Sequence, residues 1–160
     1  MAVTDDYILG LLECVMDPEV PVLSILDLGI VRQINAAKKT IVITPTYSGC
    51  PAMQTIEDDI QILFKENGLT DFQIETTLTP AWTTDWMTES GKEKLRAYGI
   101  APPVGTSNDK NILFGDEKVV ACPQCKSKQT SLVSQFGSTA CKALYKCTEC
   151  LEPFDYFKCI

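Results

Sequence analysis

The sequence predicts an α+β protein, in which a two-layer α/β domain with a three-stranded sheet precedes a small β-rich unit. Three observations support this prediction. Segments with helical and strand periodicity follow one another over residues 1–100 in the order helix, strand, strand, helix, strand, helix. A stretch that contains Pro and Gly and lacks periodicity comes next. Finally, residues 117–160 hold six of the eight cysteines.

The first predicted helix begins after Thr4, whose hydroxyl can cap it, and has Asp5 and Asp6 in its first turn. It is expected to end at Asp17, because the residue before a proline, here Pro18, leaves the helical conformation. The apolar face of this helix comprises Tyr7, Ile8, Leu11, Leu12 and Val15.

A hairpin is predicted next. Residues 30–35 alternate as a strand, residues 36–39 form a turn, and residues 40–44 return as a second strand.

The second half of the first domain is predicted to be a helix, a strand and a short helix. Helical spacing over residues 52–67 ends before Gly68, a residue suited to a helix C-terminus. Residues 71–78 alternate as the third strand, and a short helix over 90–98 ends at Gly99. The helices are therefore expected to cover one three-stranded sheet.

The composition predicts two domains. We expect a first domain over residues 1–100, a linker over 101–116 and a second domain over 117–160. Residues 117–160 hold six Lys against four acidic side chains, a net charge of +2, whereas residues 1–116 have a net charge of -9.

The overall composition limits the class of protein. No apolar run approaches the ~18 residues of a membrane-spanning helix, and the basic opening of a signal peptide is missing, so a cytoplasmic protein with no membrane partner is expected. In the cytosol thiols stay reduced, which favours metal ligands or reactive thiols over disulfides for the eight cysteines. The net charge of -7 disfavours a nucleic-acid partner.

The chain contains no histidine. Ser-His-Asp and Cys-His catalysis and histidine-ligated catalytic zinc are therefore excluded for this chain alone. No arrangement of Lys, Glu or Tyr residues in the sequence indicates a catalytic site.

Two CxxC pairs lie in the second domain and are separated by 21 residues. Two such pairs can bring four thiolates to one tetrahedral ion, and so small a domain needs that ion to fold. The prediction is a structural zinc ribbon whose ligands are Cys122, Cys125, Cys147 and Cys150.

Other interpretations of this segment remain open. Iron fits the same four-thiolate geometry. Glycine commonly follows each CxxC pair in such ribbons, whereas Lys126 and Leu151 stand there, so the turns could be irregular. A closed four-sulfur site has no open position for substrate, and a protein contact is a more plausible role than catalysis.

Cys50 lies between Gly49 and Pro51, at the predicted start of the second helix. Gly49 permits backbone conformations closed to other residues, and proline fits the first helical turn. The thiol would then face the positive end of the helix dipole, which favours a thiolate and suits a metal-sulfur ligand or a persulfide carrier. An inert, packed cysteine is the alternative.

The remaining cysteines give weaker signals. Cys141 precedes Lys142, whose charge would favour a thiolate, but burial as a small apolar residue is as plausible. Cys159 could be functional or buried. Cys14 lies near the apolar face of the first helix and is expected in the core.

Several motifs resemble known families. DPEVP at residues 17–21, DLGIV at 27–31 and TPTYSGCP at 44–51 resemble the metal-sulfur cluster assembly family that includes SufT-type proteins. FGSTACKA at 136–143 and EPFDYFKC at 152–159 resemble the C-terminal part of the PaaD-like proteins of phenylacetate degradation.

The resemblance implies a non-catalytic accessory protein that helps iron-sulfur cluster or metal-centre maturation in the phenylacetyl-CoA epoxidase system. Its partners would be the reductase or oxygenase components and the cluster-assembly machinery, and a homo-oligomer is compatible with it. The family's functional cysteine corresponds to Cys50, which would bind a transient iron-sulfur cluster, and its acidic motif corresponds to Asp17 and Glu19. These two residues could instead form a simple turn.

Alternative functions are a cysteine-dependent redox protein, with Cys50 or Cys141 as nucleophile, a structural component of the monooxygenase, or a nucleic-acid-binding ribbon. Trp82 and Trp86 could form a partner contact or belong to the core.

Overall fold

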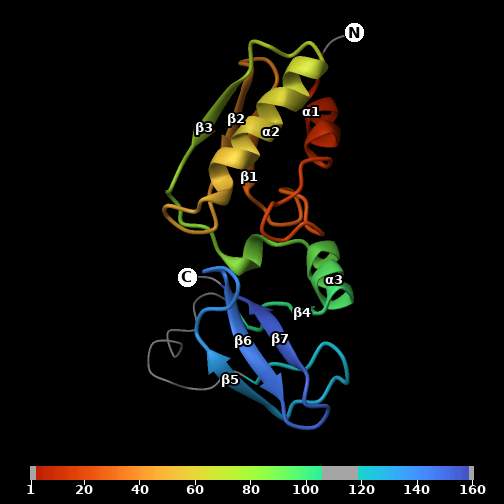
Figure 1. Ribbon diagram of the computed structural model, residues 1–160. Coiled ribbons are helices and arrows are strands. Elements are labelled where there is room, and N and C mark those ends of the chain that lie inside the picture. Colours follow the sequence, from red (N-terminus) through yellow and green to blue (C-terminus); the bar gives the residue numbers. More distant parts are fainter. Residues whose placement is uncertain (1–2, 106–118, 159–160) are drawn as a thin grey trace. The chain divides into compact units, whose positions relative to one another are not determined.

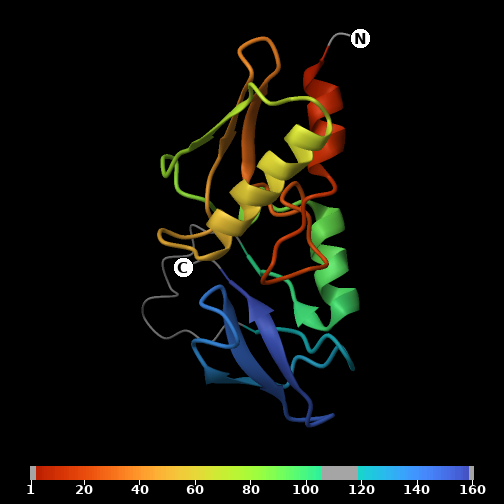
Figure 2. The same cartoon turned by 45° about the horizontal axis from the view of Figure 1, so that its top comes forward.

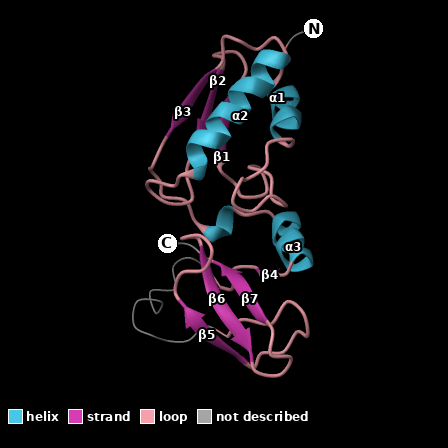
Figure 3. Ribbon diagram, in the orientation of Figure 1, coloured by secondary structure: helices cyan, strands magenta, loops and turns pink. Residues whose placement is uncertain are grey.

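The computed structural model describes residues 3–105 and 119–158, which form two compact units (Figures 1 and 2). The first is built from residues up to Trp82 together with Trp86–Thr88, and the second from Thr83–Asp85 together with residues from Glu89 onward. The first unit has a three-stranded sheet and the second a four-stranded sheet (Figure 3). The predicted α+β class is confirmed.

Helix α1 spans Asp5–Leu12, and the side-chain oxygen of Thr4 caps it as predicted. The prediction that this helix continues to Asp17 is wrong. Asp17 instead donates its backbone N–H to the carbonyl of Leu23 at 2.8 Å, beside an isolated antiparallel bridge. This pairing satisfies backbone groups that a longer helix would have used, so the helix ends early.

The predicted hairpin is confirmed and consists of β1 (Val31–Asn35) and β2 (Thr40–Ile43), which pair antiparallel. Strand β3 (Gln73–Thr76) pairs with β2 in parallel, so the sheet order is β1-β2-β3. A parallel pair needs a crossover connection, and α2 (Ala52–Glu66) supplies it. In Figures 1 and 2, α2 crosses one face of this sheet.

The buried face of α2 forms the core of the first unit together with β2. Ile41 and Ile43 on β2 are fully buried. Gly68 has a φ of 71°, the left-handed conformation that commonly ends a helix. The buried residues of α2 are Ala52, Met53, Ile56, Ile60 and Phe64.

The loop before β1 is fixed by close packing against two tryptophans. Gly29 has a φ of 69°, and a Cβ at this position would lie 2.2 Å from the carbonyl oxygen of Trp86. Trp82 is buried, and its indole N–H donates to the carbonyl of Leu28 at 2.8 Å. Arg32 lies 3.5 Å above the centre of the Trp86 ring. Trp82 therefore belongs to the core, as one of the two interpretations predicted.

The second unit begins with a short 3-10 turn, η1 (Thr84–Trp86), whose last residue belongs to the first unit. Helix α3 (Glu89–Tyr98) and strand β4 (Ile100–Ala101) follow. The boundary at residue 100 stays a prediction, although the compact units divide nearer to residue 88. Most of the predicted linker over 101–116 lies outside the described residues.

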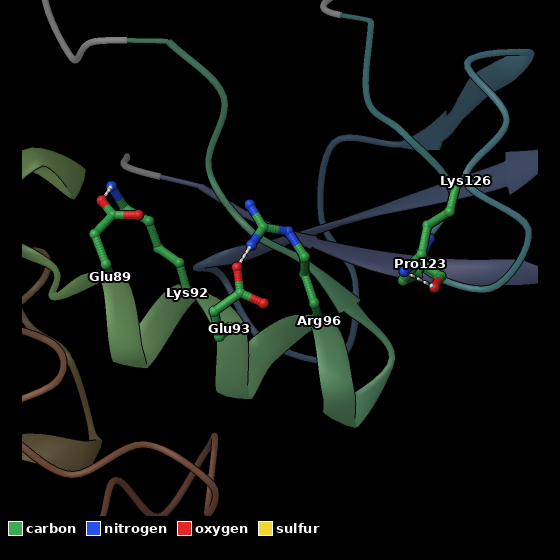
Figure 4. A network of polar contacts seen from close by, with 6 residues as sticks. All are labelled: Glu89, Lys92, Glu93, Arg96, Pro123 and Lys126. Atoms are coloured by element: carbon green, nitrogen blue, oxygen red, sulfur yellow. Dashed lines mark hydrogen bonds and ion pairs between the residues drawn. The ribbon is translucent and has the colours of Figure 1, made fainter.

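Surface ion pairs line α3 (Figure 4). Lys92 lies 2.8 Å from Glu89, and Arg96 pairs with Glu93, each three residues apart. Such pairs on the helix surface contribute little to helix stability, because solvent screens them.

The sheet of the second unit contains β5 (Thr130–Ser134), β6 (Lys142–Cys147) and β7 (Pro153–Phe157) in the order β4-β7-β6-β5. Strand β4 pairs with β7 in parallel, and the other pairs are antiparallel. The core cluster of this sheet comprises Ala101, Val120, Cys122, Ala143, Tyr145, Cys147, Phe154 and Tyr156.

Among the described residues, no helix has the length and apolarity that crossing a membrane requires.

Candidate metal centre and reactive thiols

Four cysteines of the second unit converge on one point. Their sulfur atoms all lie within 4.8 Å of one another. The Sγ atoms of Cys122 and Cys150 are 3.7 Å apart, and those of Cys125 and Cys147 are 3.6 Å apart. Cys122 and Cys147 are buried, whereas Cys125 and Cys150 are exposed.

The two CxxC turns are built alike. The backbone N–H of Cys122 donates to the carbonyl of Ser127 at 2.8 Å, and that of Cys147 donates to the carbonyl of Glu152 at 3.0 Å. The residue after each second cysteine is left-handed, with φ 65° at Lys126 and 64° at Leu151. The two turns are thus regular although neither has the usual glycine. In the first turn, the Lys126 ammonium also donates to the Pro123 carbonyl at 2.9 Å (Figure 4).

This arrangement fits a tetrahedral metal ion. Four sulfurs at a zinc–sulfur distance of ~2.3 Å lie about 3.8 Å apart, close to the two shortest sulfur separations here. A backbone hydrogen bond from Cys150 lowers the pKa of Cys147 to about 7. A backbone hydrogen bond from Glu152 lowers the pKa of Cys150, but desolvation and the neighbouring sulfurs outweigh it and raise the value to about 12. Close thiolates repel one another, and a cation removes that cost.

Cys50 lies one residue before the N-cap of α2, which is Pro51. Gly49 has a φ of 77°, and the backbone N–H of Cys50 donates to the carbonyl of Tyr47 at 3.3 Å. The carbonyl of Cys50 accepts the N–H of Met53 at 3.2 Å. The residue is half-buried, and the first turn of α2 has no acidic side chain to offset the helix dipole. The local backbone therefore fixes Cys50 in a position that solvent can reach.

The acidic motif forms a turn. Asp17 is buried, and one of its carboxylate oxygens accepts the backbone N–H groups of Glu19 at 2.8 Å and Val20 at 2.7 Å. Glu19 itself is half-buried. Asp17 therefore forms the turn that one of the two interpretations predicted.

Cys141 is buried immediately before β6, beside Thr139, whose Oγ1 lies 3.1 Å from its sulfur. Its carbonyl accepts the backbone N–H of Lys158 at 2.9 Å. Burial lowers the pKa of Lys158, and a negative charge on Cys141 would raise it. The ammonium of Lys142 donates to Ser138 Oγ at 3.3 Å, and its expected influence on the Cys141 thiol stays a prediction.

The predicted thiols therefore divide between the units. Cys50 belongs to the first unit, and Cys141 belongs to the second together with the four-cysteine cluster. Cys14, predicted to join the core, is exposed because it follows the end of α1. Cys159 lies outside the described residues. Thr139 is one of the small and hydroxyl residues that precede Cys141 in sequence, whereas no local signal pointed to Lys158, because the pairing of β6 with β7 brings the end of β7 beside Cys141.

Two family descriptions match the sequence. Residues 5–65 match the description "iron-sulfur cluster assembly protein", and residues 106–158 match the description "PaaD zinc beta ribbon domain". Cys50 lies in the first match, and all four clustered cysteines lie in the second.

Individual relatives cover the same segments. A protein of Escherichia coli (strain K12), provisionally named as one of the subunits of 1,2-phenylacetyl-CoA epoxidase, is 52% identical over 153 residues, which cover 94% of this chain and 90% of that protein. An Fe-S protein maturation auxiliary factor of Porphyromonas gingivalis is 30% identical over 96 residues, covering 58% of this chain and 90% of its own length. The crystal structure of a domain of unknown function from Bacillus anthracis superposes with a TM-score of 0.53 at 26% identity, over 57% of this chain and 90% of that one.

Proposed function

We propose that this chain, which belongs to the PaaD-like family, is a non-catalytic assembly factor for phenylacetyl-CoA epoxidase. In this family an iron-sulfur cluster assembly domain precedes a PaaD zinc ribbon. It would help iron-sulfur clusters or metal centres mature in the reductase or oxygenase components of that system. The name of the Porphyromonas gingivalis relative, a maturation auxiliary factor, supports this role.

The observation on which the proposal depends is the position of Cys50. Its thiol is half-buried, precedes the start of α2 and lies within the segment that matches iron-sulfur assembly proteins. Iron-sulfur clusters are usually held by four thiolates. A single thiolate from Cys50 would supply one of these ligands, so a cluster or its sulfur could pass on to a client that supplies the rest.

Gly49 and the acidic turn would support this thiol. The left-handed backbone at Gly49 sets the direction of the chain into Cys50. Asp17 holds the turn that presents Glu19, and we assign Glu19 to a contact with the client. Both assignments rest on the motif that these residues share with the assembly family.

The ribbon would have a structural role. We assign the four-cysteine cluster to zinc, which closes the site with four sulfurs and leaves no position for substrate. The zinc would tie the two CxxC turns together and give the small sheet a fixed surface for protein partners.

Cys141 is the second thiol that we assign to cluster handling. It differs from Cys50 because it is 4% exposed and contacts the Thr139 hydroxyl. Access to it therefore requires local opening of the strand ends around it.

Metal and acid-labile sulfide analysis of anaerobically purified protein tests the proposal. The wild-type chain should contain one zinc and additional labile iron and sulfide. The Cys50→Ala variant should keep the zinc and lose most of the iron and sulfide, and Cys141→Ser should lose a smaller share. Equal iron and sulfide in wild type and Cys50→Ala would contradict the role of Cys50. The same analysis identifies the metal of the ribbon, because iron in place of zinc would give a red protein.

A second candidate is a structural component of the epoxidase, which the name of the Escherichia coli relative favours. Such a component should copurify with the oxygenase components at fixed stoichiometry after their metal centres are complete. An assembly factor should bind the components before maturation and dissociate afterwards. Size-exclusion chromatography of matured and unmatured components with this chain separates the two candidates.

A further inference from the structure

A groove of about 700 Å³ lies between α2 and β3 in the first unit. One wall is a stripe along α2 with helical spacing, and the other comes from β3 and the loop before it. The stripe consists of Asp58, Gln61, Ile62 and Lys65.

The groove has a mixed lining, with apolar side chains beside polar and charged ones. Phe64 and Phe72 meet edge to face inside it, with ring centres 5.1 Å apart. Ile62 lines the groove and is 55% exposed, and Ile74 on β3 is only half-buried. Folding of the first unit has therefore left apolar surface in the groove that a further chain segment could cover.

The strand beside the groove has an open edge. Among the described strands, β3 pairs with β2 alone. The backbone N–H groups of Gln73 and Thr77 donate toward β2, to the carbonyls of Lys39 at 2.8 Å and Ile43 at 2.9 Å. Because the backbone groups of successive strand residues alternate in direction, those of the residues at 74 and 76 point away from β2. β3 contains no proline or lysine, and its one charged residue is Glu75, so a basic segment meets no like charge on this strand.

The charges of Asp58 and Lys65, which line the groove, balance, but the charged side chains along the neighbouring β3 strand are acidic. Glu75 on β3 is exposed, and Asp58 lies in the groove wall. Glu57 accepts the hydroxyl of Thr76 at 2.8 Å, which places another carboxylate beside the strand. Lys65 is the one cation among the described residues that line the groove. A positively charged segment is therefore the complementary occupant.

We propose that this groove binds an extended segment of a partner protein that contains lysine or arginine, which adds as a strand to β3 and places an apolar side chain between Ile62 and Phe72. Backbone hydrogen bonds to the β3 edge would give affinity, and the groove and Glu75 would select the sequence. A second copy of the chain is a poorer occupant, since its net charge of -7 is repelled by the same acidic edge. The proposal is independent of the role of Cys50.

Peptide titration of the zinc-loaded full chain, followed by NMR at low ionic strength, tests it. The probe is the peptide Thr-Lys-Val-Lys-Ile-Lys-Thr-Gly, and the matched control has Glu in place of each Lys. We expect the basic peptide to bind at least about tenfold more tightly than the acidic one and to shift the amide signals of β3 and of Ile62. Glu75→Lys should weaken binding of the basic peptide roughly fivefold, a change typical of a surface charge contact.

Glu13→Lys is the control variant, because it makes the same change in net charge on an exposed residue outside the groove. This variant should bind the basic peptide with an affinity within about twofold of the wild-type value. An equal loss of affinity in both variants would overturn the proposal, as would the absence of saturable binding. A dimer of the peptide-free chain that Ile62→Asn dissociates would also overturn it, because the groove would then be a contact between two copies.

Discussion

The two thiol sites of this chain differ in how many sulfurs the fold brings together. In the ribbon, four cysteines from two turns lie within 4.8 Å of one another, and two of them are buried. In the first unit, Cys50 is half-buried at the start of α2. Four converging sulfurs can hold an ion permanently, whereas one thiolate can hold a cargo and release it. On the proposed function, the number of ligands, more than the residue type, separates the structural site of the ribbon from the transfer site at Cys50.

Removal of a ribbon ligand should have the largest effect. Cys147→Ser removes a fully buried ligand, and a structural zinc contributes on the order of 10–16 kcal/mol to such a fold. We expect the variant to lose its zinc and the cooperative unfolding of the ribbon. Zinc content and near-UV circular dichroism measure both. Cys14→Ser, a change at an exposed cysteine, is the control and should affect neither. Retention of stoichiometric zinc by Cys147→Ser would contradict the structural role.

Gly29→Ala should strongly destabilise the first unit, which is the unit that contains Cys50. The new Cβ would lie 2.2 Å from the Trp86 carbonyl oxygen, and φ is 69°. Overpacking and the left-handed conformation together should cost about 2–4 kcal/mol. Urea unfolding, followed by tryptophan fluorescence, measures this loss. A loss below about 1 kcal/mol would show that the loop adjusts.

Gly49→Ala is the matched change beside Cys50. Its φ is 77°, but no atom lies within 4 Å of the added Cβ, so only the backbone conformation is penalised. We expect a loss of about 1 kcal/mol in the same urea experiment. A loss as large as that of Gly29→Ala would mean that the backbone around Cys50 is packed more tightly than the structure indicates.

Leu151→Gly should have the smallest effect, and it should be stabilising. Leu151 is left-handed with φ 64° and is 65% exposed, so glycine removes strain and little packing. The more flexible unfolded chain offsets part of the gain, and a net increase of about 0.5 kcal/mol in ribbon stability is expected. Thermal unfolding at fixed zinc concentration measures it. Destabilisation would indicate that the Leu151 side chain contributes to the turn.

The sequence predicted most of the architecture because periodicity is a local property. The order of elements, the hairpin and the CxxC pairs all follow from residues close together in the chain. The early end of α1 could not be predicted in this way, because it depends on a hydrogen bond from the backbone N–H of Asp17 to the carbonyl of Leu23, on the other side of a proline-containing loop. The pairing of β4 with β7 also could not be predicted, since it joins a two-residue strand to the far end of the ribbon.

The candidate sites show the same limit. The four clustered cysteines could be predicted because spacing alone identifies two CxxC turns. The contact of Lys158 with Cys141 could not be predicted, because the backbone of Lys158 reaches Cys141 from the end of another strand.

Cluster loading of client proteins tests the central difference between the two thiol sites most directly. Cells that produce the epoxidase components together with wild-type chain, Cys50→Ala or the control Cys14→Ala would be compared for iron and sulfide bound to the purified clients. We predict that Cys50→Ala keeps its zinc and its unfolding temperature while client loading falls severalfold, and that Cys14→Ala matches wild type. Full client loading with Cys50→Ala would contradict it.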